Sequence, residues 1–478
     1  HWLPLPTSGH SAQCAADTRE LARCGSARSA RSVVPGTNPV ARCRFPTRQS
    51  TPCSATMHKR SLATAVLCGG LRVAAAHSAT NCTAAHSALV AFGEAVMTFK
   101  PRPATPVHVA LPLAAPAAEV VQAVGGAELN VAVALSRVSA APIASYVSVL
   151  PHGPLGDAVR SAAEASGVAT ENVVVDGSPH SVLGTLHVVD DGSGPRPHYQ
   201  RHHSAFATVA SGDTFDWPSL LSPAKWLHVT GITPLLGPGP AAAWSTALEA
   251  AAATDGCDVS LDFNHRPALG SLEELWALVQ PHVAARAVTL LMLSEDSLRR
   301  LAEREGVWPG EGAEHASQAA ALSSLRQRWG VPLLGCCFKR AAAPREAASG
   351  GLKDTQEHKN TLFGGGGVVR WSVVATAAGE VSTGDTPVVH RPREALGGGD
   401  AWVAGFLHGL LDAGEGWRGE AASSRAAIAR ACRRGDLLAA LSMARFGDLS
   451  DVSGGALRAA EARWAGVTAQ LNASGAGD

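Results

Sequence analysis

The sequence predicts an α/β fold in which helices cover both faces of a mainly parallel sheet. Short apolar runs at 226–232, 259–263 and 289–293 are separated by Ala- and Leu-rich helical segments such as 241–254. This alternation is typical of βαβ units, because parallel strands need a long crossover connection. Active sites in such sheets lie at the carboxyl ends of strands, and a Gly-Gly-Gly-Asp run at 397–400 follows a strand candidate.

The Gly-Gly-Gly-Asp run predicts an anion site with a base beside it. Gly397, Gly398 and Gly399, here called the anion loop, can turn the chain sharply and direct their N–H groups into one space. A helix that begins near Asp400 adds its positive end to that space, which favours a phosphate group. The Asp400 carboxylate could then take a proton from a neighbouring hydroxyl, as phosphoryl transfer to an alcohol requires. The alternative is an ordinary helix whose N-cap is Asp400.

Composition favours a folded, mildly acidic body with a large core. Of the 478 residues, 46% are apolar and 17% are charged, which suits one large α/β domain or two smaller ones and argues against global disorder. The 40 basic and 40 acidic residues balance, but ten of the basic and two of the acidic ones lie in residues 1–93. The acidic excess of the remainder predicts no nucleic-acid partner, and no apolar run is long enough to predict a membrane partner.

Residues 1–86 are predicted to form a disordered or targeting-like leader ahead of the folded body. The segment is rich in Arg, Ser, Ala and Pro and lacks sustained apolar periodicity. Such a basic, acid-poor segment is typical of organelle transit peptides. We therefore expect a plastid or mitochondrial location if it is one, and a cytoplasmic location otherwise. The alternative is low-complexity or translated non-coding sequence.

A chain that starts near Ser87 is expected to keep both its fold and its activity. Residues 1–86 lack the apolar pattern needed to join a core, and none of the predicted site residues lies among them. Circular dichroism, thermal melting and activity of the shortened chain, measured beside those of the full chain, test this expectation. Loss of folding on removal of the leader would contradict it.

The ten cysteines predict free thiols rather than a zinc site. Six lie at or before Cys82, and the other four are Cys257, Cys336, Cys337 and Cys432. These four include no Cys-x-x-Cys pair, so the spacing of a structural zinc site is absent. We expect buried or idle thiols in a reducing compartment.

Residues 397–406, Gly-Gly-Gly-Asp-Ala-Trp-Val-Ala-Gly-Phe, resemble the carboxy-terminal signature of the PfkB (ribokinase-like) carbohydrate kinases. The Gly-Gly-Gly-Asp form is similar to the branch of 2-dehydro-3-deoxygluconate kinases. Further pieces match the family in its order: Phe-Gly-Glu at 92–94, Gly-Gly-Ala-Glu-Leu-Asn-Val-Ala at 125–132, Leu-His-Val-Thr-Gly-Ile at 227–232, Leu-Asp-Phe-Asn-His-Arg-Pro at 261–267 and Phe-Gly-Asp at 446–448. The resemblance implies a ribokinase-like three-layer α/β/α sandwich over residues 87–470, with a small β-strand lid.

The resemblance also implies a reaction. It is the Mg²⁺-dependent transfer of the ATP γ-phosphoryl group to a hydroxymethyl group of a sugar or sugar acid, with 2-dehydro-3-deoxy-D-gluconate the favoured acceptor. Asp400 would be the base, the anion loop would hold the phosphoryl group, and Arg266 would stabilise its charge. A neutral sugar, as in fructokinases and ribokinases, is the alternative acceptor. A catalytically silent structural or regulatory relative is the alternative from another class.

The segment 125–130, here called the acceptor loop, holds the sugar in the family, so Gly125, Gly126 and Asn130 are predicted acceptor contacts. Adjacent glycines let the backbone approach a ligand. Asn130 projects from the first turn of the helix that follows. Tight packing of that helix on the sheet is the alternative reason for the glycines, but it leaves Asn130 unexplained.

The lid is expected to contain strands at about 105–113 and 184–202, the latter folded as a hairpin around a Gly-Ser-Gly turn. Tyr199 and Arg201 resemble the lid Tyr-x-Arg of 2-dehydro-3-deoxygluconate kinases. Period-two alternation puts both side chains on one face, where they could contact a hydroxy acid. The resemblance is compatible with a homodimer formed through the lid.

By resemblance, ATP lies along the loop after Cys337 and around the anion loop. Lys339, Gly397 and Gly399 are therefore predicted nucleotide contacts, and residues 446–448 would close the adenine side. No Lys-Ser/Thr pair follows the glycine runs, so none of them is a Walker motif.

Two departures from the family favour the silent relative. A loop insertion at about 341–367 replaces a much shorter turn. The family's Asn-x-x-Glu, which helps to place the metal, reads Ser-Glu-Asp-Ser at 294–297. Either Glu295 or Asp296 acts on Mg²⁺ through water or the metal support is weakened, so the metal ligands stay unassigned.

Overall fold

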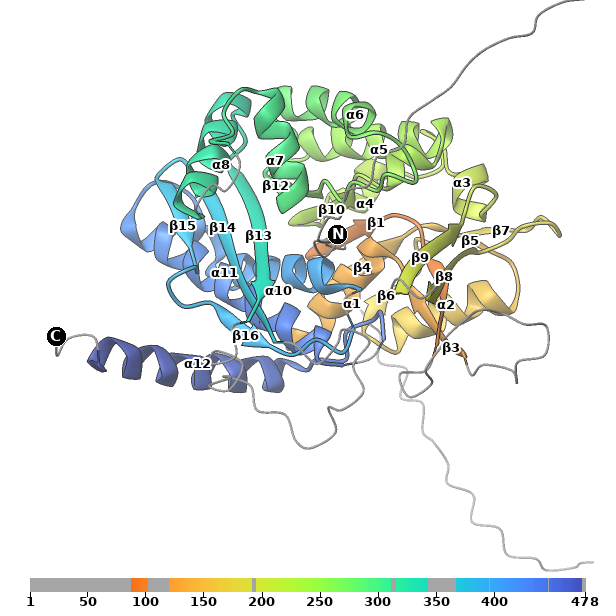
Figure 1. Cartoon of the computed structure of the whole chain (residues 1–478). Helices are drawn as coiled ribbons and strands as arrows, with labels where there is room; N and C mark the ends of the chain where they lie inside the picture. Colours follow the sequence, from red (N-terminus) through yellow and green to blue (C-terminus); the bar gives the residue numbers. More distant parts are fainter. Residues whose placement is uncertain are drawn as a thin grey trace, which may run out of the picture. The chain divides into compact units, whose positions relative to one another are not determined.

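A ten-stranded, mostly parallel sheet forms the centre of the fold, with helices on both of its faces (Figure 1). The computed structural model describes residues 87–101, 120–190, 195–310, 315–342, 367–394, 396–445 and 447–474. The strands of this main sheet are β1 (Leu89–Phe92), β4 (Ala144–Val147), β6 (Val168–Ala169), β10 (Trp226–Thr230), β11 (Asp258–Asp262), β12 (Leu290–Ser294), β13 (Leu333–Ala341), β14 (Val368–Thr376), β15 (Gly379–Ser382) and β16 (Val388–His390). Their order is β15-β14-β13-β12-β11-β10-β1-β4-β6, with β16 beside β14. Neighbours from β6 to β13 run parallel, and β14 pairs antiparallel with β13, β15 and β16.

Period-two alternation in the strands explains why helices cover both faces. In β1, Val90 and Phe92 face one core together with Trp244, whereas Leu89 and Ala91 face the other. The first core is covered by α3 (Ala205–Val209), α4 (Trp217–Leu221), α5 (Pro238–Ala252), α6 (Leu272–Ala284), α7 (Glu295–Arg304) and α8 (His315–Trp329). The second is covered by α1 (Ala127–Val138), α2 (Pro154–Glu164), α10 (Gly398–Ala413), α11 (Ala422–Met443) and α12 (Gly454–Ser474). The predicted α/β class, with three layers, is confirmed.

Helices α10 and α11 pack backbone to backbone through glycines. A Cβ at Gly405 would lie 2.6 Å from the carbonyl oxygen of Arg434, and a Cβ at Gly409 would lie 2.6 Å from the Cα of Ala431. A Cβ at Gly435 would lie 2.8 Å from the indole of Trp402. Because these glycines allow such close packing of the two helices, the helix that carries the anion loop has little freedom to slide.

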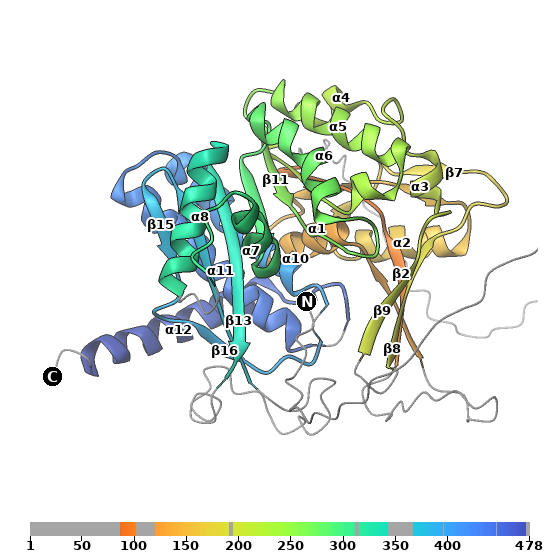
Figure 2. The ribbon, with the colours of Figure 1, turned by 45° about the horizontal axis from the view of Figure 1, so that its top comes forward.

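A second sheet of four strands forms the lid, here called the lid sheet. Its order is β3 (Val120–Gly125), β2 (Val96–Pro101), β8 (Gly184–Asp190), β9 (Pro195–Gln200). Figure 2 shows β2, β8 and β9 side by side, extending beyond the main sheet. The hairpin of β8 and β9 was predicted, whereas β2 and β3 were not. The predicted strand at 105–113 lies outside the described residues.

The chain leaves the main sheet at Ser148, within the segment Tyr-Val-Ser-Val-Leu at 146–150. There the Ser148 hydroxyl donates to the carbonyl of Gly93 at 2.7 Å, and β4 ends one residue earlier. The next strand, β5 (Val149–Pro151), pairs with β7 (Val174–Asp176) in a separate two-stranded sheet. The apolar run is continuous in sequence, so only the tertiary pairing divides it.

Several predicted features fall outside the described residues. These are the leader at 1–86, most of the insertion at 341–367, and Phe446. Within the described ranges, no helix is both long and apolar enough to cross a membrane. The four cysteines of the described part are free, as predicted.

Candidate active site

The anion loop opens α10 in a conformation that needs glycine. Helix α10 begins at Gly398, and its N-cap residue Gly397 has a φ of 74°, in the left-handed region. No side chain caps the helix. Asp400 is therefore the third residue of the first turn, and the interpretation of Asp400 as an ordinary N-cap is wrong.

One side of the anion loop is packed and the other is open. A Cβ at Gly398 would lie 2.5 Å from Met443 Sδ and 3.4 Å from Arg370 Nη2, so a side chain there would displace Met443. A Cβ at Gly399 would meet nothing within 4 Å. The Cα of Gly399 thus borders open space, and the buried guanidinium of Arg370 lies beside Gly398. This arrangement concentrates positive potential where an anion can enter.

Asp400 is held by a residue from the acceptor loop. Asn130 Nδ2 donates to Asp400 Oδ2 at 2.7 Å, although the two residues are 270 positions apart in sequence. Burial raises the pKa of Asp400 to about 7, helped by the carboxylates of Asp262 and Asp448 and opposed by Asn130 and Arg266. A carboxyl group with a pKa near neutrality is suited to accept a proton from a hydroxyl. The predicted base and the predicted acceptor contact are therefore neighbours.

The acceptor loop approaches the body where only glycine fits. Gly126 is the N-cap of α1 with a φ of 147°, and a Cβ there would lie 2.6 Å from the carbonyl oxygen of Glu94. Asn130 is 8% exposed, and its Oδ1 has no hydrogen-bond partner. A buried acceptor without a partner is costly, so this atom is available to a ligand hydroxyl.

Arg266 follows β11, and its positive charge lowers the pKa of two carboxyl groups of the site, those of Asp262 and Asp400. The pKa of Asp262 is raised to about 6 by burial, and the charge of Arg266 opposes this rise as it does at Asp400. Asn264 adopts a left-handed φ of 41° and donates its backbone N–H to Asp262 Oδ1 at 3.1 Å, which turns the chain between Asp262 and Arg266. Arg266 Nε is buried without a hydrogen-bond partner. The guanidinium is therefore placed to bind a further anion.

Tyr199 and Arg201 lie together as predicted, but Arg201 binds a carboxylate of the protein. Its Cζ is 5.2 Å from the centre of the Tyr199 ring. Its Nε donates to Glu94 Oε2 at 2.5 Å, and Glu94 Oε1 also accepts a hydrogen bond from the Ser204 hydroxyl. Arg201 is 6% exposed, so this pair is buried. It joins the end of β9 to the segment between β1 and β2.

Arg201→Ala is expected to lower the free energy of unfolding by about 3–5 kcal/mol, because it leaves Glu94 charged and buried without its partner. Arg299→Ala is the control. Arg299 forms exposed pairs with Asp296 and Glu303, and its loss should cost less than about 1 kcal/mol. Urea denaturation of both variants provides the comparison. Equal losses at the two positions would contradict a buried, structural pair at Arg201.

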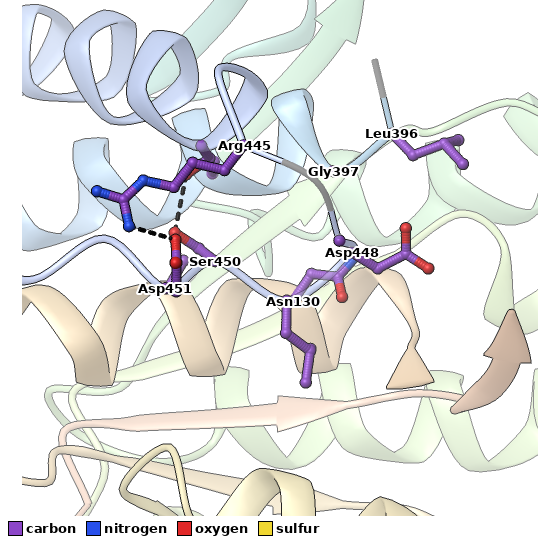
Figure 3. A pocket seen from close by; sticks show the side chains of 12 residues that line it. Asn130, Leu396, Gly397, Arg445, Asp448, Ser450 and Asp451 are labelled. Atoms are coloured by element: carbon purple, nitrogen blue, oxygen red, sulfur yellow. Dashed lines mark hydrogen bonds and ion pairs between the residues drawn. The ribbon is translucent and has the colours of Figure 1, made fainter. Parts of the chain in front are cut away.

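A pocket lies between α1, the anion loop and the segment after α11 (Figure 3). Figure 3 shows Asn130, Gly397 and Asp448 at one end and the ion pair of Arg445 with Asp451, 2.7 Å long, at the other. Asp448, which the resemblance places on the adenine side, lies beside Gly125. Its Oδ2 would lie 2.9 Å from a Cβ at Gly125, so it packs against the acceptor loop, and this oxygen has no hydrogen-bond partner.

Glu128 is a site neighbour that sequence reasoning missed. Its Oε1 accepts hydrogen bonds from the Thr230 hydroxyl at 2.7 Å and the Thr233 hydroxyl at 3.1 Å, which ties the start of α1 to the end of β10. Burial raises its pKa to about 7, although these hydroxyls oppose the rise. An acidic residue in the apolar beginning of a helix was the available signal.

The predicted nucleotide side includes the end of β13 and the start of α7. Lys339 is exposed near the end of β13, opposite Arg370 of β14, and residues 343–366 that follow lie outside the described ranges. Ser294 caps α7, and Asp296 pairs with Arg299 at 3.1 Å. The described part of the chain has no group of three or more His, Cys, Asp or Glu side chains that could hold a metal ion.

Comparison with known proteins agrees with the resemblance. A profile of the pfkB family carbohydrate kinases matches residues 87–329. The 2-dehydro-3-deoxygluconokinase of Thermotoga maritima is 22% identical, with a TM-score of 0.62 over 79% of this chain and 98% of that one. A PfkB family carbohydrate kinase of Listeria grayi is 21% identical, with a TM-score of 0.58 over 78% and 99%. The fructokinase of Xylella fastidiosa with bound ATP is 19% identical, with a TM-score of 0.55 over 79% and 98%. At these identities the solved structures show a shared fold.

Proposed function

This chain belongs to the pfkB family of carbohydrate kinases, and from that premise we propose that it phosphorylates a hydroxymethyl group of 2-dehydro-3-deoxy-D-gluconate with ATP. The observation that carries the proposal is the Asp400 carboxyl group, with its pKa of about 7, in the first turn behind the anion loop and hydrogen-bonded to Asn130. It combines a base, an anion site and an acceptor contact in one place.

In the proposed reaction Asp400 takes the proton of the acceptor hydroxyl. The oxygen then forms a bond to the γ-phosphorus of ATP, the bond from that phosphorus to the bridging oxygen breaks, and its electron pair leaves on ADP. Asp400 afterwards returns the proton to solvent. Asn130 keeps the Asp400 carboxylate oriented toward the acceptor, because their hydrogen bond fixes one of its two oxygens.

Charge on the moving phosphoryl group is stabilised by the amides of the anion loop and by Arg266. The amides belong to the start of a helix, so they are fixed before the reaction and need no reorganisation. Arg266 presents a partly buried guanidinium with a free Nε–H. Lys339, Gly397 and Gly399 are the proposed contacts of the ATP phosphates.

Mg²⁺ is expected to accompany ATP and to neutralise part of the phosphate charge. Mg²⁺ usually binds through one or two carboxylates together with phosphate oxygens and water, so it does not need a cage made of protein side chains alone. That requirement fits the described residues, which contain no such cage. We assign the metal no protein ligand.

The choice of acceptor is supported by the Gly-Gly-Gly-Asp form of the anion loop and by the free Nε–H of Arg266, which suits a sugar acid. A neutral sugar is the second candidate. It is favoured by the ion pair of Arg201 with Glu94. This pair already compensates the charge of Arg201, so Arg201 attracts a substrate carboxylate less strongly.

We also propose a homodimer through the lid sheet, for which light scattering of the purified chain is the check.

A panel of acceptors tests the function directly. We expect ATP consumption and a phosphorylated product with 2-dehydro-3-deoxygluconate, and much weaker turnover with fructose or ribose. The Asp400→Asn variant serves as the catalytic control. Preference for a neutral sugar would select the second candidate. Binding of ATP without transfer to any sugar or sugar acid would select the silent relative.

A further inference from the structure

We propose that Lys100 is a positioning residue of the acceptor site, which orients the carboxylate of Asp448 and couples the lid sheet to the anion loop. The inference rests on the proposed function, because it concerns the acceptor side of the same site. It begins from a buried charge that the reaction itself does not use.

Lys100 lies on β2 with its side chain 2% exposed. Its ammonium group is 3.0 Å from Glu394 Oε2 and also forms an ion pair with Asp448 Oδ1. The side chains of Glu394 and Asp448 are 6% and 4% exposed, so all three charges are removed from water. A buried ammonium is tolerated only with such partners, and the three groups therefore hold one another in place.

The two carboxylates come from segments that border the anion loop. Glu394 precedes Gly397 by three residues, and its backbone N–H donates to the carbonyl of Met443, the last residue of α11, at 3.1 Å. The carbonyl oxygen of Asp448 would lie 3.1 Å from a Cβ at Gly397. One ammonium group on the lid sheet thus contacts both segments that flank the loop.

Asp448 retains an oxygen that the cluster does not satisfy. Lys100 occupies Oδ1, whereas Oδ2 is buried without a hydrogen-bond partner and faces Gly125 of the acceptor loop. The orphaned Oδ1 of Asn130 belongs to the same pocket. Two unpaired acceptors beside a loop predicted to hold a polyhydroxy compound are suited to bind its hydroxyl groups.

The ammonium group therefore has a role in binding beyond packing. Lys100 occupies Oδ1 of Asp448, which leaves Oδ2 beside the acceptor loop, where it can accept a hydrogen bond from a hydroxyl. Without Lys100, Glu394 and Asp448 would repel each other, and Asp448 would lose the bond that fixes its orientation. The acceptor would then bind less well, whereas ATP, whose proposed contacts do not include the Asp448 carboxylate, would be less affected.

The test compares four variants of the full chain: Lys100→Met, Lys100→Arg, the pair Lys100→Met with Glu394→Met, and Lys225→Met as an exposed control. Lys100→Met should raise KM for the acceptor by about 10- to 100-fold, the loss expected for a hydrogen bond to a charged group, and should leave KM for ATP unchanged within about twofold. Lys100→Arg should restore part of the acceptor KM because it returns the charge. Lys225→Met should match the parent.

The double variant separates positioning from simple stabilisation. Two methionines replace the Lys100–Glu394 pair with apolar volume, which should restore Tm to near that of the parent. If Lys100 positions Asp448, the acceptor KM of this variant stays high. If KM returns with Tm, Lys100 only joins the lid to the body and the inference is wrong. Equal rises in KM for ATP and acceptor would also overturn it. A parent chain that phosphorylates no acceptor would refute the proposed function, and with it the role of Lys100.

Discussion

Asp400→Asn is expected to lower kcat by at least ~10²-fold at pH 8, because a positioned general base contributes about 10²–10⁴-fold in rate. The amide keeps the size of the carboxyl group and can still accept the hydrogen bond from Asn130. It cannot take the acceptor proton. ATP binding should be retained, and stopped-flow or coupled-assay rates at saturating ATP and Mg²⁺ measure the loss.

The same substitution should not destabilise the protein. Burial raises the pKa of Asp400 from its ordinary value of 3.8 to about 7, so the folded chain binds the proton more tightly than the unfolded chain. Stability is therefore lost as pH rises between about 4 and 7, and the full cost of the buried charge is present above pH 7. Asparagine carries no charge at any of these pH values. We expect the variant to melt at or above the Tm of the parent at pH 8.

Asp412→Asn, on the exposed end of the same helix, is the matched control, and it should keep the parental kcat. The parent should also lose activity as pH falls below about 7, when Asp400 becomes protonated. An unchanged kcat in Asp400→Asn would refute the role of Asp400 as the base. A rate that is flat from pH 5 to 8 would do the same.

Arg266→Met is expected to lower kcat by about 10²–10³-fold, the usual loss when one preorganised donor to a developing charge is removed. It should also shift the pH profile. The charge of Arg266 lowers the pKa of Asp400, so its removal moves the acid limb of the profile to higher pH. A residue that only supported the fold would not produce this displacement.

Arg304→Met, an exposed change on α7, controls for the loss of a guanidinium and should leave both rate and profile unchanged. Measurements at several pH values separate the two effects of Arg266. A lower kcat with an unmoved acid limb would mean that Arg266 contacts the phosphoryl group but does not influence Asp400. An unchanged kcat would remove Arg266 from the mechanism.

The main sheet could be predicted from sequence because its strands are buried on both faces. Strands β10, β11 and β12 lie in the short apolar-rich runs at 226–232, 259–263 and 289–293 between helical segments, which is the pattern of a covered parallel sheet. The lid strands β2 and β3 give no such signal. Strand β3 has partly exposed side chains, and β2 is held between β3 and the distant β8, so its pairing depends on non-local contacts.

The site could be predicted only where its residues form short motifs in the sequence. Asp400, the anion loop and the acceptor loop carry short motifs, and the structure brings them together through Asn130. The cluster of Lys100 with Glu394 and Asp448 joins positions 294 and 348 residues apart, which no local pattern reveals. The one available signal was the lysine in the segment Val-Met-Thr-Phe-Lys-Pro at 96–101, whose other residues carry no charge. Arg201 has a recognisable motif, but its partner Glu94 could be found only in three dimensions.

The glycine-mediated contact of α10 with α11 bears on how this protein could be re-engineered. Gly405, Gly409 and Gly435 leave no room for a side chain, so random libraries that include them would consist mostly of unfolded clones. The lid sheet is built from its own four strands, which pair with one another and not with the main sheet. Directed evolution of acceptor choice should therefore vary the lid and leave the helix pair untouched. Exchange of the whole lid between relatives would have to keep Lys100 and Arg201, because their buried ion pairs join the lid to Glu394, Asp448 and Glu94.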